Sequence, residues 1–300
     1  MLPHPSKASH EPILHVYQTY SCPCRGRAGM TTSATGDVTS REDSRSPVSV
    51  AFNGMIAEVA LNNGPINLVT KPMLRALNDV LLEIVASAEV RCLILHGGEG
   101  RAFCAGSDIK EFSHLRKDAS EHKILFEDMV LRHLAHMPMP TIAAIDGPAL
   151  GGGLELALAC DLRVSKRGAV MGLTESRLGG LAGNGSLRLT RLIGPARAKQ
   201  MLFTGETVAD DQALAWGLVN RVITDGSALD GARELAVTIV SRGPVSNRLA
   251  KELVDAAQDL PLDAGLSMST KAQQQIFDSN DLHEGVAAFF AKRQPEFKGR

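Results

Sequence analysis

The sequence has few aromatic residues and almost no net charge. Phe, Trp and Tyr make up 4% of its 300 residues, and 32 basic side chains balance 33 acidic ones, which leaves a formal net charge of −1. Because no basic field attracts nucleic acid, a nucleic-acid partner is not expected. No apolar run reaches the roughly 18 residues of a membrane helix, since Asp146 and Glu155 interrupt the longest candidate. No membrane association is expected either.

Several catalytic signatures are also missing. The sequence has no Gly-x-Ser-x-Gly elbow, no Gly-x-x-x-x-Gly-Lys-Ser/Thr loop and no His-Glu-x-x-His pair. The dinucleotide fingerprint fails because Leu156 stands where its third glycine would be. His133 and His136 lie three residues apart, but no Cys or carboxylate set completes a ligand shell around them. We therefore expect neither a metal nor a bound cofactor.

Cysteines are spread along the chain rather than clustered. Cys92, Cys104 and Cys160 lie in apolar strand-like or helix-like runs and are expected to be reduced core residues. This favours a reducing compartment, so we expect the cytoplasm, with the mitochondrial matrix as the alternative. Cys22 and Cys24 lie in a segment too irregular to indicate a metal or redox site.

That segment, residues 1–47, is rich in Pro, Ser, Thr and His and has no sustained periodicity. It is predicted to be a disordered N-terminal extension. One explanation is a targeting peptide with Arg25 and Arg27, and the other is a reading frame drawn too long, with translation beginning at Met30. The irregular proline spacing fits poorly with an amphipathic transit helix and favours the second.

Beyond the extension, the hydrophobic pattern predicts an α/β fold. Residues 48–52 and 56–61 alternate like a hairpin around Asn53-Gly54. Strand pairs followed by helices recur to about residue 170, and the final stretch turns helical. We divide the chain into a core, residues 48–225, and a helical region, residues 226–300. The face of the first long helix is predicted from the spacing of Leu74, Leu77, Leu81, Leu82 and Val85.

A turn of three glycines, residues 151–153, separates a strand-like run from an apolar helix-like run. Without Cβ atoms these residues let a bound carbonyl approach the backbone, and the helix start offers unpaired N–H groups. Such a turn can stabilise an oxyanion. Glu155, which follows it, has leucines on both sides and no polar face to occupy. A buried carboxylate is costly unless it is paired, neutral or used, although a Glu that answers the helix dipole is the plainer reading.

A second strand-to-helix turn lies upstream, at residues 101–111, and again places small residues before a helix start. Asp108 and Glu111 have the spacing of an N-cap and capping box, so both acids are given a structural role. The functional group is then the backbone N–H of Ser107 and not its hydroxyl. Two turns that each point an N–H outward can form an oxyanion hole.

Together these stretches resemble the crotonase superfamily, and within it the enoyl-CoA hydratase/isomerase family. The resemblance runs from about Val48 to the end and rests on three ordered motifs and a matching tail. The motifs are LNNGPINL at residues 61–68, FCAGSDIKE at 103–111 and IDGPALGGGLELA at 145–157, and the tail has EGV at 284–286 and FAKR at 290–293. The resemblance implies a spiral of strand-strand-helix units with a helical C-terminal region that assembles a homotrimer or homohexamer.

The resemblance also implies site residues. The N–H groups of Ser107 and Gly152 would hold the thioester oxygen of an acyl-CoA, and the two acids of family hydratases match Glu155 and Glu175. Coenzyme A would arrive as part of the substrate. Four further positions, of lower specificity, match substrate contacts: Ala105, Arg101 at the CoA phosphates, and Asn67 and Leu68 on the adenine side of the groove. Asn67 also suits an ordinary turn. A surface carboxylate satisfied by Arg177 is the competing account of Glu175, and a solvated arginine that of Arg101.

The chain departs from the family just beyond Glu175. Many hydratases have Pro-Gly-x-Gly-Gly-Thr-Gln-Arg where this sequence has AGNGSLR at residues 182–188. Gly183 and Gly185 are expected to keep a flexible turn, without the proline that fixes φ. The expected activity is hydration of a 2-enoyl-CoA. Isomerisation, decarboxylation or thioester hydrolysis through the same enolate are the alternatives, and a non-catalytic acyl-CoA binding protein is a third class. Chain length, pathway and stereochemistry stay open.

Overall fold

The computed structural model describes residues 46–112 and 115–300. It begins with the predicted hairpin, in which β1 (Val48–Asn53) and β2 (Ile56–Leu61) pair antiparallel. Gly54 in the turn has a φ of +60°, which glycine adopts without steric cost. The predicted disordered extension lies outside the described residues except for Ser46 and Pro47, and so do Cys22, Cys24 and Met30.

A six-stranded sheet forms the centre of the fold, in the order β1-β2-β3-β4-β6-β9. All pairs after the hairpin are parallel, and they involve β3 (Cys92–His96), β4 (Thr141–Ile145), β6 (Leu162–Lys166) and β9 (Arg221–Ile223). A smaller sheet joins β5 (Ala149–Leu150), β7 (Val170–Gly172) and β8 (Val208–Ala209). Single bridges link Cys104 to Ala149 and Val69 to Ser107, so the loops after β3 and β4 meet.

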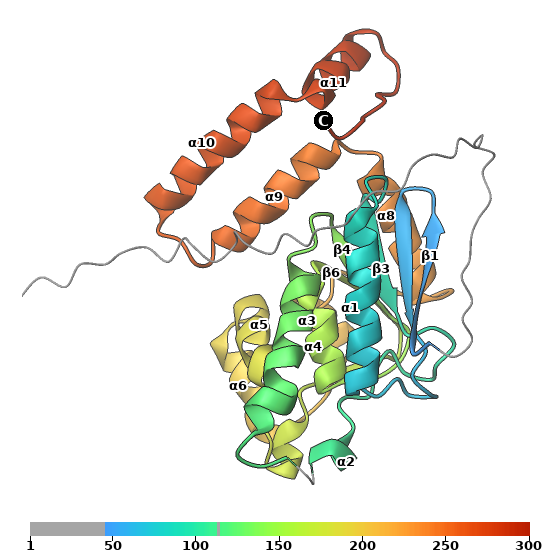
Figure 1. The fold of residues 1–300 in the computed structure, drawn as a ribbon, viewed down its shortest axis with the longest axis vertical. Coiled ribbons are helices and arrows are strands. Elements are labelled where there is room, and N and C mark those ends of the chain that lie inside the picture. The colour runs from blue at the N-terminus through green and yellow to red at the C-terminus, as the bar shows by residue number, and fades with distance from the viewer. Residues whose placement is uncertain (1–45, 113–114) are drawn as a thin grey trace, which may run out of the picture. The chain divides into compact units, whose positions relative to one another are not determined.

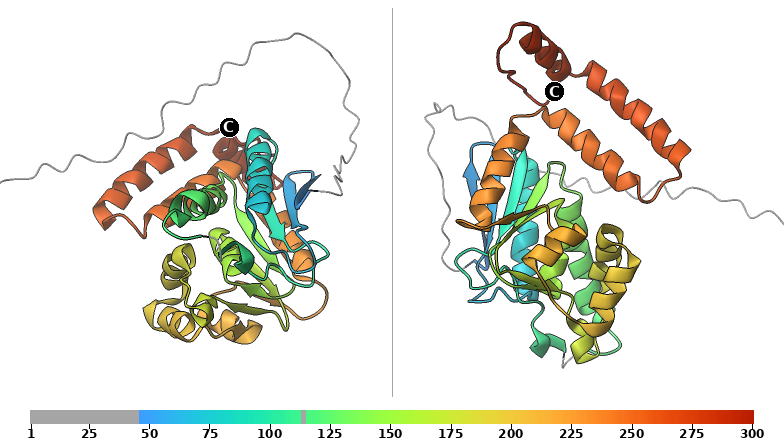
Figure 2. Two further views of the ribbon diagram at one scale, coloured as in Figure 1. Left: turned by 60° about the horizontal axis from the view of Figure 1, so that its bottom comes forward. Right: turned by 180° about the vertical axis from the view of Figure 1, so that it is seen from behind.

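Helices cover both faces of the large sheet, because successive strand residues point to opposite faces. Leu95 and Ala143 pack towards α1 (Lys71–Ala86), α3 (Leu125–Ala135) and α4 (Gly152–Ala159). Ile94 and Ala144 pack towards α8 (Ala228–Val240). Figure 1 shows α1 and α3 in front of the strands, and the view from behind in Figure 2 shows α8 on the other side.

The predicted face of α1 is partly wrong. Leu74, Leu77 and Leu81 are buried, but Leu82 and Val85 are 53% and 45% exposed. Met73 and Ile84 complete the buried face instead, because each lies three or four residues from one of the buried leucines.

Further helices and helical turns connect these elements. They are α2 (Ile109–Phe112), the π-helical η1 (Ser120–Ile124), the 3₁₀ turn η2 (Glu175–Leu178), α5 (Gly183–Ile193), α6 (Pro195–Thr204) and α7 (Asp210–Trp216). None of the described helices is both long enough and apolar enough to cross a membrane. Cys92, Cys104 and Cys160 are buried free thiols, as expected.

The C-terminal stretch is helical, with α9 (Pro244–Ala256), α10 (Leu262–Asp278) and α11 (Asn280–Phe290). Lys251 of α9 ties this group to the core through a 2.8 Å ion pair with Asp161. Large apolar side chains on α10 and α11 are exposed: Leu262, Leu266, Phe277, Phe289 and Phe290. The division of the chain at residue 225 stays a prediction. Helix α8, which lies beyond that division, packs against β3, β4 and β6 of the large sheet.

Candidate active site

The first glycine turn, residues 104–107, follows β3. Val69 fixes it, since its N–H donates to the Gly106 carbonyl at 2.8 Å and its carbonyl accepts from Asp108 N–H at 3.0 Å. Gly106 has a φ of +104°, which a side chain would strain. Among the described residues the N–H of Ser107 has no acceptor. It is therefore available to a ligand, as the sequence predicts.

Asp108 caps α2, because its carboxylate accepts from Lys110 N–H at 3.0 Å. The predicted capping box is wrong in its second half. The Asp108 N–H already donates to Val69, and Glu111 lies 3.7 Å from the ammonium of Lys123 instead. The mostly buried ammonium of Lys123, and not the Asp108 N–H, is therefore the partner of the Glu111 carboxylate.

The second glycine turn, residues 150–153, leads from β5 into α4. Gly151 has a φ of +52°, and Gly152 is the first residue of the helix, so the N–H of Gly152 has no intrahelical acceptor. Gly153 packs so closely on the Cys104 carbonyl that no Cβ would fit. A Cβ on Gly152 would lie 3.0 Å from the Ser107 hydroxyl oxygen. The structure therefore brings the two predicted oxyanion residues side by side.

Glu155 is 7% exposed in the first turn of α4. Its Oε1 accepts from Gly185 N–H at 2.6 Å. Burial raises the pKa of Glu155 to about 7, and the nearby carboxylates of Glu127, Glu175 and Asp128 add to the rise. A carboxyl with this pKa exchanges its proton near neutral pH, which suits general acid–base chemistry.

Glu175 begins η2 and is half-buried. Its Oε1 lies 2.9 Å from the position of a Cβ on Gly151, so the carboxylate rests against the second glycine turn. Its Oε2 is buried without a hydrogen-bond partner among the described residues, and no ion pair joins Glu175 to Arg177 there. Burial, above all, raises the pKa of Glu175. The competing account of a satisfied surface carboxylate does not describe it.

The expected flexible turn at Gly183 and Gly185 is instead the first turn of α5. A Cβ on Gly185 would lie 2.9 Å from Glu155 Cγ, whereas one on Gly183 would meet nothing within 4 Å. Gly185 therefore holds Glu155 by close contact as well as by its N–H. The glycine spacing was visible in the sequence, but its helical conformation was not.

Asn67 is fully buried with a φ of +51°. Its amide nitrogen donates to the carbonyls of Gly97, Ala102 and Phe103 at 2.8 to 3.2 Å, and its oxygen accepts from Asn63 N–H at 2.9 Å. The side chain braces the loop between β3 and the first glycine turn and uses its amide fully there. A contact of Asn67 with a substrate stays a prediction.

The other predicted substrate positions are less constrained. Leu68 and Ala105 are half-buried and Arg101 is exposed. The N–H groups of Ala105 and Arg101 donate to Ile66 and Pro65 carbonyls at 2.9 and 2.8 Å, which leaves only side chains and carbonyls for a ligand. Contacts of these residues with a substrate stay predictions. His133 and His136 hydrogen-bond to Asn78 and to the Arg132 carbonyl.

A third carboxylate near the turns has no counterpart in the sequence analysis. Glu127 on α3 places Oε1 3.6 Å from the Cβ position of Gly152, and its Oε2 lies 3.3 Å from Lys123 Nζ. In sequence, a lysine and a glutamate four residues apart on a helix indicate an ordinary surface pair. Here both side chains are mostly buried, 12% and 14% exposed.

Comparisons with known proteins agree with this geometry. Residues 51–300 match the family model described as enoyl-CoA hydratase/isomerase. The bovine enoyl-CoA hydratase domain-containing protein 2, mitochondrial, is 39% identical over 82% of this chain and 86% of its own, and the short-chain-enoyl-CoA hydratase of Clostridium acetobutylicum is 34% identical over 82% and 96%. The crystal structure of an enoyl-CoA hydratase from Bacillus anthracis superposes with a TM-score of 0.81 at 36% identity, covering 85% and 100%.

This fold, with its helix-starting glycine turn set against a second strand-to-helix turn, defines a member of the crotonase superfamily. The matches narrow the class further. The chain belongs to the enoyl-CoA hydratase/isomerase family, which confirms the resemblance and the predicted fold. Its reaction is that of an enoyl-CoA hydratase or isomerase.

Proposed function

We propose that the protein is an enoyl-CoA hydratase that adds water across the 2,3 double bond of a 2-enoyl-CoA. The observation that carries this choice is a pair of glutamates at the second glycine turn, with Glu155 in the first turn of the helix that begins there and Glu175 against Gly151. Glu155 lies on α4 and Glu175 on η2, and the pKa of each carboxyl is raised above its ordinary value. The charge of Glu175 contributes to the rise in the pKa of Glu155. Hydration needs two proton transfers, and the site has two acids to perform them.

The steps balance with these groups alone. An ionised carboxylate takes a proton from water as the oxygen bonds to C3, and the other, protonated, gives its proton to C2. Negative charge that develops on the thioester oxygen is stabilised by the N–H groups of Ser107 and Gly152. A pKa of about 7 lets Glu155 take either role near neutral pH. Each acid–base group contributes about 10²- to 10⁴-fold, and an oxyanion donor about 10²- to 10³-fold.

Isomerisation is the runner-up, since one carboxylate can move a proton between two carbons of a 3-enoyl-CoA. Decarboxylation and thioester hydrolysis through the same enolate need one acid as well. The second buried carboxylate, Glu175, favours hydration over all three. A binding protein without turnover would not require two acids with raised pKa in contact with an oxyanion turn.

The test is turnover of a panel of 2-enoyl- and 3-enoyl-CoA esters, with products identified by mass spectrometry. Glu155→Gln and Glu175→Gln should each slow hydration by about 10²-fold or more while the affinity for CoA esters stays close to that of the wild type. Glu252→Gln, on an exposed ion pair, is the control. Full hydration by Glu175→Gln would contradict the two-acid mechanism and favour a one-acid reaction.

We further infer that Leu68 lies on the adenine side of the substrate groove, that Ala105 is a further substrate contact and that Arg101 serves the CoA phosphates, with no cofactor beyond the CoA of the substrate. The exposed aromatic and aliphatic side chains of α10 and α11 support a homotrimer or homohexamer, because exposed apolar patches mark interaction surfaces. The cytoplasm is the proposed location, with the mitochondrial matrix as the alternative. Light scattering on the purified chain measures the assembly.

A further inference from the structure

Lys123 and Glu127 form a mostly buried ion pair beside the oxyanion turn. Glu127 lies next to Gly152, whose N–H is the proposed donor to the thioester oxygen. The carbonyl end of a bound acyl group would therefore sit next to Glu127, and an acyl chain that passes towards α3 would meet this pair. Neither residue belongs to the two-acid mechanism.

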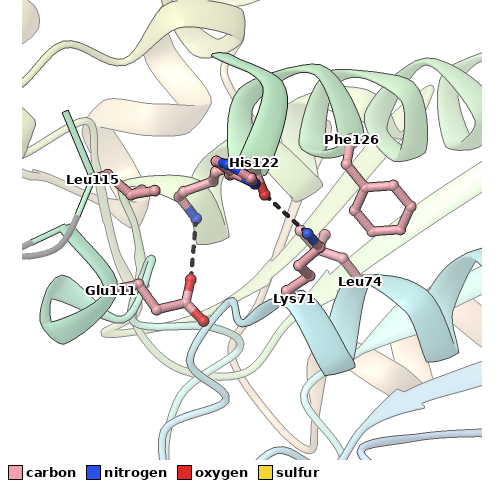
Figure 3. Close-up of a pocket in the computed structure, with 7 residues that line it drawn as sticks. Lys71, Leu74, Glu111, Leu115, His122 and Phe126 are labelled. Carbon is pink, nitrogen blue, oxygen red and sulfur yellow. Dashed lines mark hydrogen bonds and ion pairs between the residues drawn. The ribbon is translucent and has the colours of Figure 1, made fainter. Parts of the chain in front are cut away.

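A cavity of about 230 Å³ is lined by Lys123 but not by Glu127 (Figure 3). Its walls are partly apolar, with Leu74, Leu115 and Phe126, and partly polar, with Lys71, Glu111 and Lys123. The ammonium of Lys71 donates to the His122 carbonyl at 3.0 Å, so Lys71 is already occupied. The cavity can thus take a short carbon chain, but a chain that enters it passes charged groups.

Both members of the pair have unused hydrogen-bonding capacity. The Lys123 Nζ is buried and makes no hydrogen bond within residues 46–112 and 115–300, since its carboxylate neighbours lie at 3.3 and 3.7 Å. Glu127 uses Oε2 for the ion pair, and its Oε1 accepts no hydrogen bond from those residues either. A buried donor and a neighbouring acceptor are therefore open at the same place, and the unsatisfied ammonium of Lys123 is costly unless a ligand accepts from it.

Charge decides which ligand group fits. A carboxylate could accept from Lys123, but it would be the third negative charge around one ammonium, after Glu111 and Glu127. An ammonium would face the charge of Lys123. A neutral hydroxyl accepts one hydrogen bond and donates one, so it satisfies Lys123 and Glu127 together.

We propose that Lys123 and Glu127 are specificity-determining residues that select 2-enoyl-CoA esters with a hydroxyl group on the acyl chain. The inference rests on the proposed hydratase function. A hydrocarbon chain of the same length leaves the two polar groups unsatisfied and is bound less tightly in the transition state.

The experiment compares kcat/KM for (E)-2-hexenoyl-CoA, its 4-, 5- and 6-hydroxy derivatives, and a 2-enoyl-CoA of similar length that ends in a carboxylate. The wild type should prefer one of the hydroxy esters by about 10- to 100-fold, the range expected for a hydrogen bond to a charged group. The double variant Lys123→Met/Glu127→Leu should lose that preference. Replacing a buried pair by apolar residues of similar volume usually preserves folding, which melting temperature checks.

Arg248→Met/Glu252→Leu is the matched control, because it removes an exposed pair with the same four-residue helical spacing. It should keep the wild-type preference. Glu127→Gln, closest in shape to the native residue, should reduce the preference by about 3-fold or more and gives a second reading should the double variant fail to fold.

The proposal is overturned where the wild type hydrates (E)-2-hexenoyl-CoA but prefers no hydroxy ester, where the carboxylate ester is preferred, or where the preference survives the double substitution. Absence of any hydration would count against the hydratase function instead. In that case calorimetric binding of hexanoyl-CoA and its hydroxy derivatives decides the hydroxyl question alone, with tighter binding of a hydroxy ester supporting the proposal and equal binding contradicting it.

Discussion

Glu155 and Glu175 both lie near the second glycine turn, but they are held in different ways. Glu155 sits within a helix, is almost fully buried, and has its carboxylate bound by the N–H of Gly185. Glu175 sits at the start of a short 3₁₀ turn, is half-buried, and has one oxygen without a partner among the described residues. Figure 1 shows α4 beside α3, against which it packs.

The contrast shows that the surroundings of a carboxylate can change its pKa and can also fix its position. Burial shifts the pKa of both groups upward, but only Glu155 receives a backbone hydrogen bond from a separate helix. Glu155 is therefore the positionally fixed member of the pair. Glu175 keeps a free oxygen that can reach a water molecule or a substrate hydrogen.

The largest effect that would sharpen this contrast is on stability. Folding raises the pKa of Glu155 from 4.5 to about 7. Between these two pH values the folded chain keeps the Glu155 proton, whereas the unfolded chain has lost it. Folding is thus penalised progressively as pH rises from about 4.5 to 7, and the full penalty, about 3 kcal/mol, is present above pH 7.

Glu155→Gln removes the penalty, so its unfolding free energy relative to wild type should rise by about 3 kcal/mol between pH 4.5 and 8. Urea unfolding at one fixed protein concentration measures this. Glu175→Gln should show a smaller rise, because Glu175 is less buried. A larger rise for Glu175→Gln than for Glu155→Gln would reverse the comparison.

A substitution behind Glu155 should have the next largest effect. Gly185→Ala places a Cβ 2.9 Å from Glu155 Cγ and pushes the carboxylate from its position. Misplacement by about 1 Å costs up to about 10²-fold in rate, so we expect kcat to fall by about 10- to 100-fold.

Gly183→Ala is the control for that substitution, because a Cβ there meets nothing within 4 Å in the same helical turn. Its kcat should stay within about 2-fold of wild type, and the added alanine slightly favours the helix. Equal losses in both variants would mean that the start of α5 matters as a whole and that Glu155 is not specifically held by Gly185.

The smallest effect is expected at Ser107. Because its N–H is the proposed donor, Ser107→Ala should keep kcat/KM within about 2-fold, whereas removal of an oxyanion donor costs about 10²- to 10³-fold. Steady-state kinetics with the best 2-enoyl-CoA ester measures it. A folded Ser107→Ala protein without activity would show that the hydroxyl takes part in the reaction.

The fold and the two turns were predictable because glycine spacing and alternating apolar runs are local signals. The hairpin at Gly54 followed from such signals, whereas the pairing of Ser107 with Gly152 followed from the resemblance to the family. The bracing role of the Asn67 side chain was not predictable, because the carbonyls that it binds lie 30 to 36 residues away in the sequence. The prediction failed where the partner comes from another part of the chain.

Glu127 was missed for the same reason. Its spacing from Lys123 is that of any solvent-exposed helical pair, and nothing in the local sequence shows that α3 lies against the start of α4. Leu82 and Val85 show the converse, since apolar side chains at helical spacing do not reveal which side of α1 meets the sheet. Both facts depend on tertiary packing.

The contact between Gly153 and the Cys104 carbonyl links the site to the folding of the chain. The two residues are far apart in sequence, so this packing forms only when the loop beyond β3 and the start of α4 have come together. The donors for an oxyanion are consequently not a preformed local motif that survives partial unfolding. They exist only where the core holds the two turns together, so a partly unfolded chain in which these turns have separated lacks them.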